Sequence, residues 1–273
     1  EADAPENPKE WFETTGGPIH GYTNNSFPDV TTENTCLTVT YYDNYVFKSG
    51  LDGRYDYDSS QLSSSGGKGQ EPTEFVRVKG QVTGTKVKNL ESNDWYLTVN
   101  YYDDQYRVIQ SIADNVKGGI NKVTNVYDFT GKVLRTRSDH SISTGAVAST
   151  ERRMSYDHVG RLLQTDHKTN VADHPGQLDF VTLAKNEYNE LGQLVTKGLH
   201  STDNGANVKQ QVDYRYNIRG WLTRINDSEL SAIDGGPGDY FGMNLGYDNG
   251  FGLAGSGALF NGNISAIKYS TNL

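Results

Sequence analysis

Cysteine, long apolar runs and clustered positive charge are all scarce in this chain of 273 residues. Cys36 is the single cysteine, so the chain forms no internal disulfide and no cysteine-based metal site. There is no run of about 18 apolar residues, which argues against a membrane-spanning helix. The formal net charge of −9 disfavours binding to nucleic-acid phosphates and attraction to anionic membranes.

Turn-forming residues and tyrosine are abundant instead, with 30 glycines and 18 tyrosines. Tyrosine buries its ring while its hydroxyl stays hydrated or hydrogen-bonded, which suits a thin, extended sheet. Many glycines indicate many tight turns. The first residues, 1–5, are polar and lack the pattern of a secretion signal, so we expect a removed signal or a segment of a longer polypeptide.

The strongest pattern is a turn core, Tyr-(Asp/Asn)-x-x-Gly-x-Leu, which recurs along the chain. A degenerate copy begins at Tyr102, with Tyr106 in place of the glycine, and a weaker one begins at Tyr42. The spacing between copies is irregular, so the turn core is constant while the opposite connection varies. The tyrosine, the acid or amide and the glycine of the four full copies are Tyr127, Asp128, Gly131, Tyr156, Asp157, Gly160, Tyr188, Asn189, Gly192, Tyr216, Asn217 and Gly220.

Each copy is predicted to be a β-hairpin. Val212, Tyr214 and Tyr216 alternate with polar residues, as in a half-buried strand. The Asp or Asn accepts hydrogen bonds from backbone N–H groups of the turn, and the glycine supplies a positive φ. Because a single hairpin is marginally stable in water, the units must pair edge to edge or stack. The sequence therefore predicts an all-β, antiparallel β-hairpin repeat array, with the motif tyrosines in a file along it.

The segment Tyr156-Asp157-x-x-Gly160-Arg161-Leu162 resembles the core of the YD repeat, which occurs in Rhs proteins, in shell components of Tc-type toxins and in teneurins. The resemblance covers residues 95 to 225, and the flanks 78–87 and 259–268 resemble segments of Rhs-type proteins of Bacteroidetes. It implies a ribbon that forms a partial β-shell or solenoid, in an extracellular or cell-surface protein. It also implies that such a shell encloses a C-terminal toxin or effector.

Three regions are expected: an N-terminal, β-rich and loop-rich region at 1–85, the YD-repeat array at 86–230, and a glycine-rich segment at 231–273 that starts a further repeat. The chain would then be a fragment of a longer one. Local expectations within these regions are strands at 37–42, 74–78 and 264–269, a mobile loop at 59–70 and a short helix near 227–233.

No residues are expected to form a catalytic, cofactor or metal site, so the chain is predicted not to be an enzyme. The segment 250–255 fits G-x-G-x-x-G but lacks the helix that would hold a pyrophosphate. His167 and His174 could approach each other but have no third ligand. Each turn core offers one carboxylate or amide, which is too few oxygen ligands for calcium.

Trp95, at the entry of the array, and Trp221, where the repeat usually carries Arg or Lys, are the candidate ligand-binding aromatics. They could stack on sugar rings, or cap open ends of the array, which we favour. The leading hypothesis is thus a structural segment whose partner is the remainder of its own polypeptide, without nucleic acid or membrane insertion. A carbohydrate-binding or adhesive module that binds glycans is the alternative, and a glycan-processing enzyme is a less favoured third.

Overall fold

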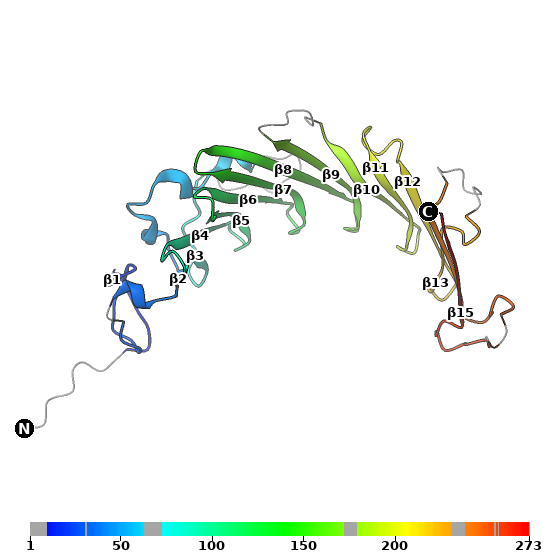
Figure 1. Cartoon of the computed structure of the whole chain (residues 1–273), viewed down its shortest axis with the longest axis horizontal. Helices are drawn as coiled ribbons and strands as arrows, with labels where there is room; N and C mark the ends of the chain where they lie inside the picture. Colours follow the sequence, from blue (N-terminus) through cyan, green and yellow to red (C-terminus); the bar gives the residue numbers. More distant parts are fainter. Residues whose placement is uncertain are drawn as a thin grey trace, which may run out of the picture. The chain divides into compact units, whose positions relative to one another are not determined.

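The computed structural model describes residues 10–30, 32–62, 73–171, 179–230, 238–253, 255 and 257–272. Within these residues, strands β2 to β15 are hydrogen bonded in the order of the chain, as the colours of Figure 1 show. The predicted all-β, antiparallel hairpin array is confirmed. No helix of the described residues is long and apolar enough to cross a membrane.

The strands are β1 (Thr15–Ile19), β2 (Thr38–Tyr42), β3 (Val82–Lys88), β4 (Trp95–Tyr102), β5 (Val108–Asp114), β6 (Ile120–Tyr127), β7 (Val133–Ile142), β8 (Gly145–Tyr156), β9 (Leu162–Val171), β10 (Val181–Tyr188), β11 (Leu194–Ser201), β12 (Gln210–Tyr216), β13 (Leu222–Ile225), β14 (Phe241–Gly246) and β15 (Ala266–Thr271). The short 3-10 helices are η1 (Glu33–Thr35), η2 (Val46–Lys48), η3 (Gly53–Tyr55) and η4 (Ser59–Gln61).

The chain divides into two compact units. Unit 1 comprises Glu1–Ser149 with Val171–Asp173, and unit 2 comprises Thr150–Asn170 with His174–Leu273. The expected sequence regions at 1–85, 86–230 and 231–273 stay predictions, since a compact unit is not the same as a sequence domain.

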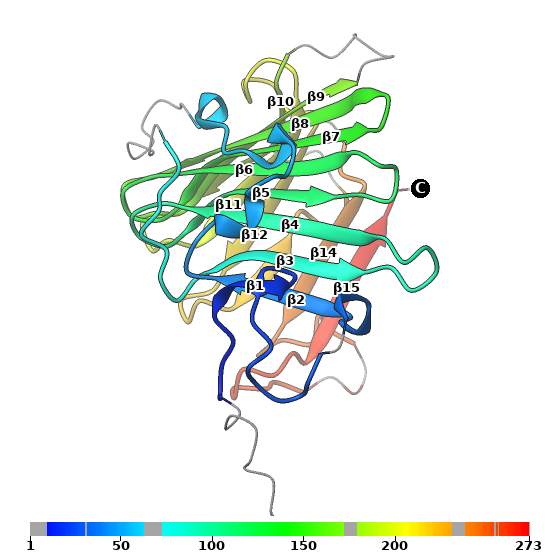
Figure 2. The same ribbon diagram turned by 90° about the vertical axis from the view of Figure 1, so that its left-hand side faces the viewer.

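The hydrophobic core of unit 1 lies under a long insertion between β2 and β3, residues 44–79. Figure 2 shows the 3-10 helices of this insertion lying across β4, β5 and β6. Backbone atoms of the insertion are held directly: Asp58 N–H donates to Gln110 Oε1 at 3.0 Å, and Gln110 Nε2 donates to the Asp58 carbonyl at 3.1 Å. The core residues from the insertion are Tyr45, Tyr55, Leu62, Phe75 and Val78, and those from the sheet include Leu97, Val99, Tyr101, Ile109, Ile112 and Val126.

The free edge of β2 is partly covered by the N-terminal segment. Tyr22 donates to the Thr40 carbonyl at 3.0 Å, and Tyr41 donates to the His20 carbonyl at 2.9 Å. Tyr41 is also stacked between Tyr22 and Phe47. Covering an edge in this way prevents uncontrolled pairing with other strands.

Unit 2 has a smaller cover on its sheet. The loop between β11 and β12 folds back over the strands, where Lys185 Nζ donates to the Gly205 carbonyl at 3.1 Å and Gln164 Nε2 donates to Asn204 Oδ1 at 3.0 Å. Beneath it Thr182 is fully buried and donates to Asp166. Polar hydrogen bonds, rather than a second apolar core, therefore hold this cover.

Several local expectations fail or shift. Residues 74–78 do not form a strand: Phe75 and Val78 are buried in irregular backbone of the insertion. Residues 59–61 form η4 rather than a mobile loop, and 63–70 lie outside the described residues. A turn closed by Leu230 N–H to the Asp227 carbonyl replaces the start of the expected helix, and 231–233 also lie outside. The expected strands at 37–42 and 264–269 are β2 and β15.

Candidate functional site

The turn core works as a local device of backbone hydrogen bonds around one side chain. In the copy at Tyr127, Asp128 N–H donates to the Lys132 carbonyl at 2.8 Å, and Gly131 N–H donates to the Asp128 carbonyl at 3.2 Å. The Asp128 carboxylate accepts from the N–H groups of Thr130 and Lys132 at 2.8 and 2.9 Å. Tyr127 then pairs with Val133 across a register shift that begins the hairpin.

The same bonds recur in each copy. The N–H at the glycine position donates to the Asp or Asn carbonyl at 2.9–3.2 Å. The side-chain Oδ1 accepts from the N–H of the residue immediately before the returning strand at 2.8–3.0 Å. The predicted positive φ is confirmed at Gly131, Gly160, Gly192 and Gly220, and Tyr106 adopts a φ of 60° where the degenerate copy lacks glycine.

The carboxylates of the turn cores accept hydrogen bonds from the backbone of the turn, and this lowers their pKa values. At Asp128, burial alone would raise the pKa, but hydrogen bonds from Thr130 and Lys132 outweigh it and lower the pKa. At Asp157, burial alone would also raise the pKa, but hydrogen bonds from the Arg161 backbone and side chain outweigh it and lower the pKa. A carboxylate held ionised by backbone donors is a turn cap rather than a general acid.

The motif tyrosines link one copy to the one before it. In four copies the hydroxyl donates to the carbonyl of the residue that starts the returning strand of the preceding copy. The printed pairs are Tyr102 to Val82 at 2.7 Å, Tyr127 to Val108 at 3.1 Å, Tyr188 to Leu162 at 2.9 Å and Tyr247 to Leu222 at 2.7 Å. These tyrosines therefore link neighbouring copies of the repeat by hydrogen bonds.

In two copies the residue after the turn-glycine position covers the next tyrosine ring. The Arg107 guanidinium lies 4.6 Å from the ring centroid of Tyr127, and that of Arg161 lies 4.7 Å from Tyr188. Both distances are in the range of a cation–π contact. Arg107 also donates to the Asp128 carbonyl at 3.2 Å, which fixes it over the next turn.

Trp221 takes the place of this arginine in its own copy. Its ring lies 5.1 Å from Tyr247, and a Cβ added to Gly262 would lie 3.0 Å from it. Trp95 contacts the His20 ring at 4.4 Å. Both tryptophans are partly buried, and each contacts another aromatic ring of its own chain. Their role as ligand-binding residues stays a prediction.

Two copies have their turn cores interrupted by insertions. Tyr42 and Asp43 are separated from Gly80 by the insertion, yet Asp43 N–H donates to the Gln81 carbonyl at 3.2 Å, and Tyr42 pairs with Val82 across the usual register shift. Tyr247 makes the usual bond to the preceding copy, and its return strand β15 follows residues 248–265. A sequence search that allowed a gap between the acid and the glycine would have found both.

A substitution at Gly192 tests whether the turn core requires a residue that adopts a positive φ. We expect Gly192→Ala to lower the free energy of unfolding by about 1–2 kcal/mol, because an L residue is strained at its φ of 82°. Its Cβ would also lie 3.2 Å from Arg161 Nη1. Gly238→Ala is the matched control, since no atom lies within 4 Å of its added Cβ. Equal unfolding midpoints in urea for the two variants would contradict the turn geometry.

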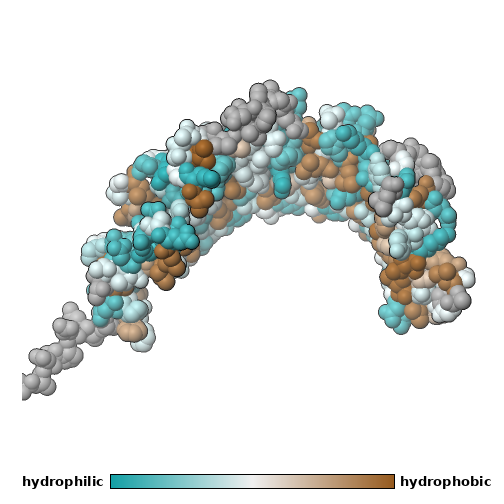
Figure 3. All heavy atoms as spheres, in the orientation of Figure 1, coloured by the Kyte–Doolittle hydropathy of each residue, from teal (hydrophilic) through white to brown (hydrophobic). Residues whose placement is uncertain are grey.

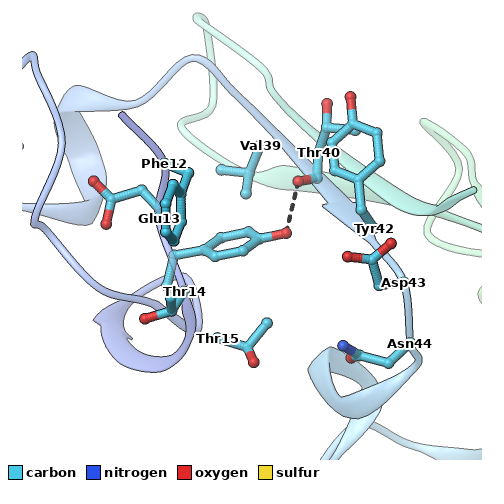
Figure 4. Close-up of a pocket in the computed structure, with 10 residues that line it drawn as sticks. Phe12, Glu13, Thr14, Thr15, Val39, Thr40, Tyr42, Asp43 and Asn44 are labelled. Carbon is cyan, nitrogen blue, oxygen red and sulfur yellow. Dashed lines mark hydrogen bonds between the residues drawn. The ribbon is translucent and has the colours of Figure 1, made fainter. Parts of the chain in front are cut away.

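A groove of about 750 Å³ lies in unit 1 beside β2. Figure 4 shows Phe12 and Glu13 on one side of it and Tyr42, Asp43 and Asn44 on the other. Burial raises the pKa of Tyr22, whose hydroxyl bonds to Thr40 at the edge of the groove. The residues lining the groove are Phe12, Glu13, Thr14, Thr15, Tyr22, Val39, Thr40, Tyr42, Asp43 and Asn44.

The N-terminal wall of the groove is held by Glu13. Its carboxylate accepts from Thr23 Oγ1 at 2.6 Å, from Asn25 N–H at 3.0 Å and from Ser26 N–H at 2.8 Å. Burial alone would raise the pKa of Glu13, but the hydrogen bonds from Ser26 and Thr23 outweigh it and lower the pKa from 4.5 to about 2.

Acid is therefore expected to release this wall. Because the folded pKa of Glu13 is depressed, its stabilising contribution is complete above pH 4.5 and is lost as the pH falls through about 2. We expect amide hydrogen exchange at Asn25 and Ser26 to accelerate over that range. In Glu13→Gln, which does not ionise, this acid-dependent step should disappear. An unchanged step in the variant would assign it to another group.

Fold and turn cores together define a β-hairpin repeat protein with YD-type turns. No protein-family model and no curated protein matches the chain. Among solved structures, it is similar to the crystal structure of TcdB2–TccC3, with 14% identity over 73% of this chain and 11% of that chain and a TM-score of 0.33. It is also similar to the Tc holotoxin pore of Photorhabdus luminescens, with 12% identity over 63% of this chain and 13% of that chain and a TM-score of 0.16. The chain spans 11% and 13% of the length of these two chains.

Proposed function

We propose that the chain is a non-enzymatic, structural segment of a YD-repeat shell, of the Rhs type of Bacteroidetes, in a secreted or cell-surface protein. In this proposal the shell encloses a C-terminal toxin or effector of the same polypeptide. The observation that carries the structural role is the bond by which a tyrosine of one copy donates to the preceding copy, as in Tyr127 to Val108 and Tyr188 to Leu162. A residue that joins neighbouring copies in this way contributes to the array as a whole.

The chemistry of the turn cores supports a non-enzymatic role. Asp103 is almost fully buried, accepts two backbone N–H groups and pairs with Arg107 Nη2 at 2.6 Å. Asn189 takes the corresponding position in another copy, where it bonds to Gln193. Since an amide replaces the carboxylate without loss of the turn, acid–base chemistry is not what this position supplies.

The strand β15 supports a partner of the same kind as the sheet itself. Among the described strands it pairs only with β14, which leaves its other edge open to a further strand. Ile267 and Tyr269 of this strand are exposed, and Figure 3 shows apolar residues gathered around β13 and β15. We therefore propose that the partner at this edge is a further hairpin of the same polypeptide.

The test uses the complete natural polypeptide, obtained from its full coding sequence. We expect further YD turn cores after Leu273 and a distinct C-terminal domain that limited proteolysis leaves intact. We also expect that domain to become protease-sensitive when it is expressed without the array. A complete polypeptide with no further turn cores and no C-terminal domain would contradict the shell proposal.

The carbohydrate-binding alternative receives less support from the geometry. Trp221 contacts Tyr247 and Trp95 contacts His20, so both rings already take part in aromatic contacts within the chain. Binding on a glycan array that is lost in Trp221→Ala, while urea unfolding is unchanged, would nevertheless favour this alternative over the purely structural role.

A further inference from the structure

The internal copies of the repeat contain a small binding site for a guanidinium group. Its elements are the ring of a motif tyrosine and the carbonyl of the Asp that follows. Arg107 occupies one such site, 4.6 Å from the Tyr127 ring and 3.2 Å from the Asp128 carbonyl. Arg161 lies over Tyr188 in the same way at 4.7 Å. In each case the arginine comes from the copy before.

The copy at Tyr42 has the same elements without the arginine. Tyr42 pairs with Val82 across the usual register shift, and Asp43 N–H donates to the Gln81 carbonyl as in the other copies. Asp43 differs in having a φ of 72° and in accepting the Gly80 N–H on its carboxylate rather than on its carbonyl. The side chain of Tyr42 is 47% exposed, whereas Tyr102 in the next copy is 6% exposed. Among the described residues, no cation–π contact to the Tyr42 ring is present.

The groove beside β2 gives access to this site and has the right charge. Tyr42 and Asp43 both line it, as Figure 4 shows. Its ionisable side chains with a formal charge are Glu13 and Asp43, and none of its lining residues is Lys or Arg. Asp43 Oδ1 accepts from Gly80 N–H at 2.5 Å, which holds the carboxylate at the turn. An acidic groove with an uncovered tyrosine ring is complementary to a planar cation.

We propose that the groove binds the guanidinium group of an arginine side chain presented by a partner polypeptide. The guanidinium stacks on Tyr42, as Arg107 does on Tyr127, and donates to the Asp43 carboxylate. This site is independent of the proposed shell function, because it depends only on the turn-core geometry of one unit. Phe12, which is exposed on the opposite wall, contributes apolar contact to the aliphatic part of the arginine.

The probe is N-acetyl-arginine amide, titrated into the protein while the aromatic NMR signals of Tyr42 are followed. We expect saturable shifts with a Kd on the order of 1 mM, since the ligand is small and makes few contacts. N-acetyl-citrulline amide has the same shape without charge, and N-acetyl-lysine amide has the charge without the planar group. Both should bind about three- to five-fold more weakly than the arginine probe or not measurably.

Two variants locate the site. Tyr42→Leu removes the ring and Asp43→Asn removes the charge while keeping an Oδ1 for Gly80, and each should raise the Kd about three- to five-fold. Tyr240→Leu, at an exposed tyrosine of unit 2, should leave the Kd unchanged. Far-UV circular dichroism establishes that each variant is folded. The proposal is overturned if the arginine probe produces no saturable shift, or if the citrulline or lysine probe binds as tightly as the arginine probe. It is also overturned if Tyr42→Leu binds the arginine probe with an unchanged Kd.

Discussion

Tyr101→Ala is expected to lower the free energy of unfolding by about 3–5 kcal/mol, the range for deleting a buried aromatic ring. Tyr101 is 1% exposed and its ring stacks on Tyr45 at 5.0 Å. Its hydroxyl accepts from Lys48 Nζ at 2.7 Å and donates to the Tyr55 carbonyl. The variant therefore loses a buried ring from the core of unit 1 and the hydrogen bonds that connect the insertion to the sheet.

Denaturant unfolding monitored by Trp95 fluorescence, in a Trp11→Phe/Trp221→Phe background that leaves one tryptophan, measures the effect on unit 1. Tyr240→Ala is the control, because that tyrosine is largely exposed and its loss should change stability by no more than about 0.5 kcal/mol. Tyr101→Phe keeps the ring and should lower the free energy of unfolding by about 2 kcal/mol, the usual net value of the two hydrogen bonds that its hydroxyl makes. Similar losses for Tyr101→Ala and Tyr240→Ala would show that the insertion does not form a core with the sheet.

Asp103→Ala should also lower the free energy of unfolding by about 3–5 kcal/mol, because it removes one partner of a buried ion pair. Asp103 bonds to Arg107 Nε at 2.7 Å and Nη2 at 2.6 Å, and it also caps the turn through Gln105 N–H. Without the carboxylate, Arg107 keeps its place over Tyr127 with its charge uncompensated. Thermal or urea unfolding of unit 1 measures the loss.

The residue pairs at the same two positions in other copies of the turn core suggest control variants for Asp103 and Arg107. Acids at this position occur with bases four residues later, as in Asp157 and Arg161, whereas Asn189 occurs with Gln193 and bonds to it at 2.8 Å. Asp103→Asn alone should therefore be destabilising, and the double variant Asp103→Asn/Arg107→Gln should recover most of the loss. A double variant less stable than Asp103→Asn would mean that Arg107 is needed chiefly for its contact with Tyr127.

Much of the fold could be predicted because the turn core is local. Asp128, Gly131 and Lys132 make their bonds within five consecutive residues, so residue types at fixed spacing were enough to predict the hairpin and the positive φ. The alternation before Tyr216 was likewise enough to predict β12. The interaction of Trp221 with Tyr247 was not predicted, since it joins residues of different copies.

The insertion and the groove depended on tertiary structure. The described residues of the insertion, 44–62 and 73–79, contain few regular elements. The burial of Phe75 and Val78 follows from contacts with a sheet that comes later in the chain. The interrupted turn core at Tyr42 is completed by Gly80, a residue that no local pattern assigns to it. By itself, the sequence determined each hairpin, because a turn needs only neighbouring residues. Only the tertiary structure decided which face of the sheet is covered and which tyrosine remains open, because both depend on residues far apart in the chain.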